Sequence, residues 1–186
     1  MHLEDAIQQR RSIKRFTDRP VSRQEIEQLL AAATLAPNHR LTQPWRFQVL
    51  GPEARHAYGA ALGERKAKKA ATPEAGRALR DTVANEHRAL PTMIVVALVK
   101  SDNPEIAEED YGAAMMGIEN LALTAVSLGL GTHIKTGAVM ADPAARAAAG
   151  VGDDERIVAV INVGEPADVP PAKPRNPVES CTSWLP

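Results

Sequence analysis

Residues 106–128 are the stretch of this sequence that most restricts its possible folds. The stretch follows Asp102-Asn103-Pro104, a typical helix start, and no proline interrupts it before Leu128. Its apolar and small residues cover nearly the whole circumference of the predicted helix. A helix of this kind needs packing partners on all sides, so we expect it at the centre of the fold or of a dimer.

Several other segments predict strands and helices around this long helix. Continuous apolar runs at residues 93–99 and 157–163 are typical of strands buried on both faces, and residues 45–50 alternate like a half-buried strand. A glycine-punctuated strand and loop is expected at residues 129–137. Further helices are expected at residues 3–9, from the capping box at Ser22 to just before Pro37, and at 142–150. Residues 53–90 are also helical in pattern, and either two surface helices or a helical excursion over a site would fit.

Composition excludes several classes of protein. The 186 residues carry a formal net charge of -1, which argues against a general binder of nucleic acid or acidic membranes. A single cysteine excludes an intrachain disulfide framework and fits a reducing compartment. There is no apolar run that could span a bilayer and no secretory leader pattern, so we expect a cytoplasmic protein. Nothing divides the chain, and we expect one domain over residues 1–186.

A dense basic stretch follows the first predicted helix, where we expect the chain to turn. Arg10, Arg11, Lys14 and Arg15 surround Ser12, whose hydroxyl is suited to a phosphate oxygen. Cations packed this closely repel one another unless an anion lies among them. From composition alone, the alternative is a solvated helix end whose cations complement the helix dipole.

Two further segments have distinctive patterns. Residues 36–47 read Ala-Pro-Asn-His-Arg-Leu-Thr-Gln-Pro-Trp-Arg-Phe, a polar loop that leads into the strand at 45–50. Residues 166–186 form a proline-rich arm that cannot fold alone and is expected to lie along another surface, with Trp184 as an anchor.

Together the basic stretch, the Gln-Pro-Trp loop, the Lys-Thr-Gly loop at 135–137 and the arm resemble the FMN-dependent nitroreductase family. Within it they are similar to a small subgroup of NAD(P)H nitroreductases, and the resemblance runs over essentially the whole chain. It implies an α+β fold in which helices flank a central, mostly antiparallel sheet. It also implies an intertwined homodimer with FMN at the interface, and an arm that extends onto the partner subunit.

The resemblance also implies which residues contact FMN. Arg10, Arg11 and Ser12 match the phosphate segment, and Lys14 would lie toward the ring near N1 and O2. Leu35, His39 and Gln43 match positions that reach FMN from the partner chain. The loop that runs past the ring corresponds to Ile134, Lys135, Thr136 and Gly137. Lys173 and Arg175 match a C-terminal basic pair that closes over the phosphate.

The implied reaction is a ping-pong transfer in which NADH or NADPH gives hydride to FMN and a nitroaromatic, quinone or similar small-molecule acceptor then takes it. Because the cofactor carries the chemistry, no catalytic side chain is assigned. No histidine pair has metal-ligand spacing with a carboxylate nearby, so we expect no metal. We expect His87 to be solvated and His133 to be structural.

Two alternatives stay open at this point. One is a flavoprotein of the same fold with other chemistry, such as enoate reduction or dehalogenation. The other is a non-enzymatic module that binds an anion or a partner protein through the basic stretch, without affinity for FMN.

Overall fold

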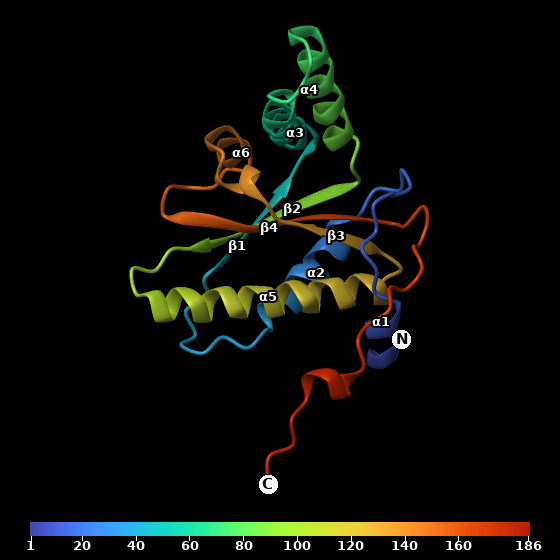
Figure 1. Ribbon diagram of the computed structural model, residues 1–186, viewed down its shortest axis with the longest axis vertical. Helices are drawn as coiled ribbons and strands as arrows, with labels where there is room; N and C mark the ends of the chain where they lie inside the picture. Colours follow the sequence, from blue (N-terminus) through green and yellow to red (C-terminus); the bar gives the residue numbers. More distant parts are fainter.

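The computed structural model describes residues 1–186 and is built on a four-stranded sheet (Figure 1). The strands lie in the order β1-β2-β4-β3, and every neighbouring pair is antiparallel. The apolar strands β2 and β4 occupy the centre, as their sequences predict. The strand bounds are β1 Trp45–Leu50, β2 Thr92–Val99, β3 Gly131–Lys135 and β4 Glu155–Gly164.

Helices cover both faces of this sheet (Figure 1). The long helix α5 and helix α2 pack against one face, where Ile94, Ile161 and Leu121 are fully buried. Helices α3 and α6 pack against the other face, and α4 pairs with α3 to form a hairpin that projects from the sheet. The helix bounds are α1 Leu3–Gln9, α2 Arg23–Thr34, α3 Pro52–Ala67, α4 Pro73–Arg88, α5 Pro104–Ser127 and α6 Pro143–Ala148.

The predicted elements are confirmed, with small differences at their ends. Helix α2 has the expected capping box, in which Ser22 and Glu25 bond each other's backbone. Helix α5 begins two residues earlier than predicted, because the Asn103 side chain caps it and Pro104 occupies its first turn. The expected break between α3 and α4 lies at Thr72, whose hydroxyl caps α4. None of the helices combines the length and the apolarity needed to cross a membrane.

The basic stretch departs from the expected turn. After α1 ends, the chain stays extended along the edge of β3, where Ser12 forms a parallel bridge with Thr132. The Ile13 amide donates to the Thr132 carbonyl at 2.9 Å, and the Ile13 side chain is buried. Gly131 makes this possible, because a Cβ at that position would overlap the Ile13 side chain. Pairing with a sheet edge therefore fixes the position of the neighbouring cations.

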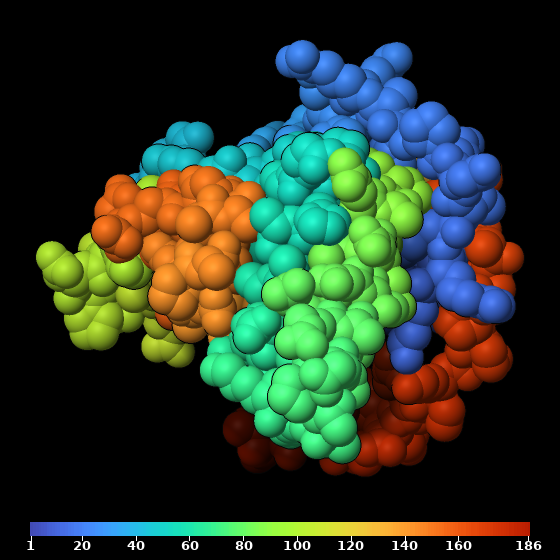
Figure 2. Space-filling model, turned by 90° about the horizontal axis from the view of Figure 1, so that it is seen from above, coloured from blue at the N-terminus to red at the C-terminus, as the bar shows by residue number.

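The start of the arm runs beside this N-terminal segment. The Ala167 amide donates to the Arg15 carbonyl at 3.0 Å, and Phe16 bridges Pro166. In a view from above, the arm and the N-terminal residues lie together on one side of the α3–α4 hairpin (Figure 2). The end of the arm leaves the body of the chain, and Trp184 is 93% exposed.

Candidate functional site

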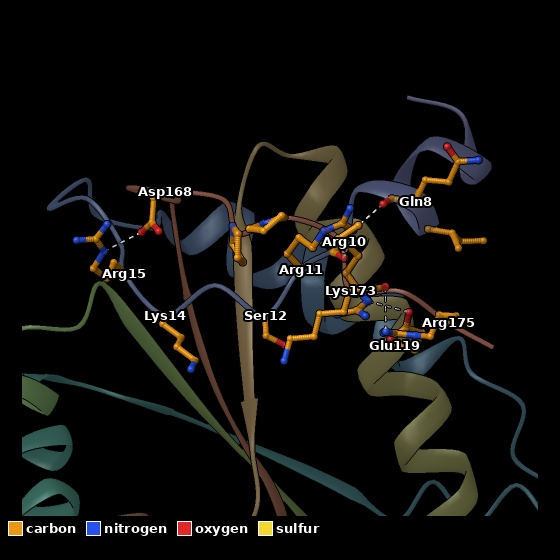
Figure 3. A pocket seen from close by; sticks show the side chains of 14 residues that line it. Gln8, Arg10, Arg11, Ser12, Lys14, Arg15, Glu119, Asp168, Lys173 and Arg175 are labelled. Carbon is orange, nitrogen blue, oxygen red and sulfur yellow. Dashed lines mark hydrogen bonds and ion pairs between the residues drawn. The ribbon is translucent and has the colours of Figure 1, made fainter.

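A cavity of about 970 Å³ opens between the N-terminal segment, the arm and helix α5 (Figure 3). Its lining contains six cationic side chains and only two carboxylates, Glu119 and Asp168. A chain with a net charge of -1 therefore concentrates positive charge in one hollow. The cationic lining residues are Arg10, Arg11, Lys14, Arg15, Lys173 and Arg175, and Ser12 lies among them.

The N-terminal segment supplies one wall of the cavity. Arg10 is the residue after α1, and its amide closes the helix by donating to the Ala6 carbonyl at 2.9 Å. The buried side chain of Ile13 holds this extended segment against β3, while Ser12 and Lys14 on either side of it line the cavity. Alternation along an extended chain thus places the serine and the lysine on the same wall.

Two of these six cations have a carboxylate partner. Arg10 lies 3.4 Å from the Glu119 carboxylate of α5, and Arg15 donates to Asp168 at 2.9 Å. Hydrogen bonding from Arg15 to Asp168 raises the pKa of the arginine, which therefore stays charged. Arg11 donates through Nη1 to the carbonyls of Gln8 and Arg10, and its buried Nε has no partner. A buried donor of this kind is expensive to leave unpaired, so the cavity has capacity for an anion.

The arm supplies the opposite wall. The Arg175 guanidinium donates only to backbone carbonyls, those of Lys173 and Pro174. In Figure 3 the side chain of Lys173 extends toward Ser12, and Arg175 lies beside Glu119. Lys173 and Arg175 lie more than 150 residues after the basic stretch in sequence, yet they line the same cavity. The structure thus brings six of the predicted site residues together.

The four predicted residues at the end of β3 lie outside this lining. Ile134 packs against the core on the α5 side, and Lys135 points to the opposite face of the sheet. Thr136 and Gly137 follow as an exposed loop, in which Gly137 adopts φ 139°, a conformation that favours glycine. Burial lowers the pKa of Lys135 to about 8, with a further contribution from Lys66.

Leu35, His39 and Gln43 are not brought into the cavity of their own chain. They belong to the segment after α2, which is anchored to the N-terminal part of α5. Arg40 holds it by donating to Glu109 at 2.9 Å, and Thr42 bonds to the buried Asp110. Leu35 is 82% exposed, and the His39 ring lies 3.9 Å from Glu109. The exposed positions of these residues leave them free to face another molecule.

Three residues of the structure were not predicted correctly from the sequence. Glu119 and Asp168 balance the cavity cations, and neither belongs to a recognisable motif. The prediction that His87 is solvated is wrong, because its side chain is only 8% exposed. Helical spacing could have revealed this, since His87 lies three and four residues after the buried Ala84 and Val83 and shares their face of α4.

Comparisons with known proteins bear on the whole chain. The model of the nitroreductase family matches residues 7–165. The chain belongs to the nitroreductase family. It is 33% identical over 179 residues to the Bacillus subtilis protein named "Putative NAD(P)H nitroreductase YfhC", a match that covers 95% of this chain and 90% of that protein. The family predicted from the basic stretch and the Gln-Pro-Trp loop is therefore confirmed.

Solved structures show the same fold. A nitroreductase-like family protein from Bacillus cereus superposes with a TM-score of 0.85 at 28% identity, covering 100% of this chain and 96% of its own. A protein from Desulfovibrio desulfuricans, described as "a putative nitroreductase in complex with fmn", superposes with a TM-score of 0.74 at 25% identity, covering 99% of this chain and 96% of its own. The predicted α+β nitroreductase-like fold is confirmed as well.

Proposed function

We propose that this nitroreductase-family chain is an FMN-dependent oxidoreductase that takes hydride from NADH or NADPH and passes it to a nitroaromatic, a quinone or a similar acceptor. The observation that carries the proposal is the cationic cavity built from both ends of the chain, around Ser12. Family membership and the FMN found in the Desulfovibrio desulfuricans relative support the choice of ligand.

The residues present fit the phosphate end of FMN. A phosphate carries nearly two negative charges and three acceptor oxygens, which suit a hollow with more guanidinium and ammonium groups than carboxylates. The unpaired Nε of Arg11 and the backbone-only bonding of Arg175 leave donors available. Arg10, Ser12, Lys173 and Arg175 are proposed to hold the phosphate, and Lys14 to interact with the ring.

Bound FMN would supply the redox chemistry by accepting and then donating a hydride. The side chains of this chain therefore need only to bind, orient and polarise the cofactor. The loop at 134–137 is proposed to offer main-chain donors to the ring, where Gly137 lets the backbone come close because it has no Cβ. No side chain is assigned as a nucleophile or general base.

A homodimer is part of this proposal. Leu35, His39 and Gln43 are proposed to reach the FMN of the partner subunit, because they lie outside the cavity of their own chain. Large apolar side chains are exposed near them, notably Leu41 and Met116. The exposed end of the arm, with Trp184, is proposed to pack on the partner subunit.

Titration of the purified chain with FMN tests the proposed ligand. Arg10→Ala should weaken FMN binding by about 10- to 100-fold, corresponding to roughly 1.5–3 kcal/mol for a hydrogen bond to a charged group. Arg23→Ala is a matched control, because Arg23 is almost fully exposed and pairs only with Glu27. Equal FMN affinity in the two variants would contradict the phosphate role of Arg10, and a wild-type chain that never binds FMN would overturn the proposed function.

A further inference from the structure

Lys135 and His87 meet on the sheet face that α4 approaches. The Lys135 ammonium, at the end of β3, lies 3.4 Å from Nε2 of His87. The other ring nitrogen, Nδ1, lies 2.8 Å from the Val83 carbonyl. Because a carbonyl can only accept, Nδ1 carries the proton, and Nε2 is the acceptor that faces Lys135. This geometry assigns a neutral imidazole and a charged lysine.

The surroundings of this pair are mainly cationic. Burial lowers the pKa values of both Lys135 and His87, and Lys66 of α3 lowers both of them further, whereas Glu86 of α4 raises the pKa of His87. His133 lies between Lys135 and Lys14, and both lysines lower its pKa, after burial. Lys14 lines the cavity and Lys135 contacts His87 of α4, so His133 is influenced by one lysine on the cavity side and one on the α4 side.

A partly buried ammonium in such surroundings needs a specific partner. Burial disfavours the charged form, and long lysine side chains readily extend into water instead. Here Nε2 of His87 is the hydrogen-bond partner that keeps Lys135 over the sheet. His87 is itself held by the Val83 carbonyl and by its position between α4 and α3, where the Tyr58 ring lies 6.4 Å away. The lysine is therefore oriented by a rigid group that belongs to a different element.

We propose that His87 is a positioning residue, which holds the Lys135 ammonium toward the ring end of the flavin site and thereby couples helix α4 to the cofactor. The position of the flavin ring near Lys135 rests on the proposed function, whereas the hydrogen bond by which His87 holds Lys135 does not depend on FMN. A fixed cation beside the ring favours added negative charge, so Lys135 raises the reduction potential of bound FMN. Without His87, the same lysine extends into solvent and this effect is lost.

Lysine titration in the FMN-free protein tests the hold of His87. In an NMR titration of the dimethylated lysines, with Lys135→Met used to assign the signal, His87→Leu should raise the pKa of Lys135 from about 8 toward its ordinary value of 10.5. His87→Gln offers an amide oxygen as acceptor and should keep it low. His56→Leu on α3 is the control, because no side-chain hydrogen bond involves His56, and it should leave the pKa unchanged. The rise is expected only if the lysine leaves its buried position, so an unchanged or lower Lys135 pKa in folded His87→Leu would overturn the proposal.

The potential of bound FMN tests the second half of the proposal. The reduction potential of bound FMN can be measured against a reference dye. In Lys135→Met it should fall by about 30 mV for a two-electron couple, which corresponds to about a tenfold lower ratio of the affinities for reduced and oxidised FMN. This is the order expected for charges that interact in a partly buried site. His87→Leu should shift the potential in the same direction, while His87→Gln and His56→Leu stay at the wild-type value. A wild-type potential in Lys135→Met would contradict the effect of the lysine on FMN, and a wild-type potential in His87→Leu alone would contradict the positioning role of His87. If neither the wild type nor any variant binds FMN, the proposed function is rejected, but the NMR test of the contact between His87 and Lys135 in the FMN-free protein remains valid.

Discussion

Two glycines of α5 provide a matched test of how the central helix packs. Gly117 meets the end of α2, where an added Cβ would lie 2.7 Å from the Ala33 carbonyl oxygen. Gly112 lies on the same helix, and an added Cβ there would meet nothing within 4 Å. Both substitutions to alanine gain roughly 0.8–1 kcal/mol of helix propensity. The difference between the two variants therefore isolates the contact between α5 and α2.

The expected size of this difference follows from the geometry. Ordinary contact begins near 3.4 Å, so Gly117→Ala must displace α2 by several tenths of an ångström, and the neighbouring group is backbone that cannot rotate away. Overpacking of this kind costs about 1–3 kcal/mol. We expect Gly112→Ala to stabilise the protein slightly and Gly117→Ala to be about 1–3 kcal/mol less stable than Gly112→Ala.

Urea denaturation at a fixed protein concentration measures this difference. With a slope of about 2 kcal/mol/M, the midpoint of Gly117→Ala should lie about 0.5–1.5 M below that of Gly112→Ala. A fixed protomer concentration is needed, because dimerisation would otherwise change the apparent stability. Equal midpoints for the two variants would refute the close crossing of α5 and α2.

Three further predictions address charge, the sheet edge and the arm. The hydrogen bond from Arg19 lowers the pKa of Glu25 to about 2, so the contribution of ionised Glu25 to the free energy of unfolding is complete above pH 4.5 and is lost as the pH falls toward 2. In acid titrations followed by circular dichroism, Glu25→Gln should therefore lose less stability over that pH range than the wild type, and equal losses would contradict the role of Glu25. Gly131→Ala should force Ile13 away from β3 and speed hydrogen exchange of the Ile13 amide, and unchanged protection would contradict the bridge. Removing residues 184–186, which include Trp184, should weaken dimerisation in sedimentation experiments, and an unaltered dimer would reject the anchoring role of the arm.

Much of the fold could be predicted because its strands and helices are strongly patterned. The apolar runs of β2 and β4 and the capping signals of α2 and α5 are local properties of the sequence. The extended path of residues 10–16 could not be predicted, because it depends on pairing with β3 more than a hundred residues later. The sequence around Arg10 predicted a turn, and its charges alone were compatible with either an anion site or a solvated helix end.

The candidate site was predictable only in part, for the same reason. The motifs indicated Arg10 and Arg175, but their convergence on one cavity depends on how the start of the arm pairs with the N-terminal segment. The loop after α2 has positive φ angles at Leu41 and Gln43, and the Asn38 side chain accepts a hydrogen bond from the Gln43 amide. Such conformations are rare for residues other than glycine, and no local signal in the sequence indicates them.

The visible spectrum of the purified protein can show directly whether this chain is an FMN oxidoreductase. The chain loaded with FMN is mixed with NADH or NADPH in the absence of oxygen, and a nitroaromatic or a quinone is then added. We predict that at least one nucleotide bleaches the flavin band and that the acceptor restores it. Bound FMN that stays oxidised with both nucleotides, or a chain that takes up no FMN, would contradict the account.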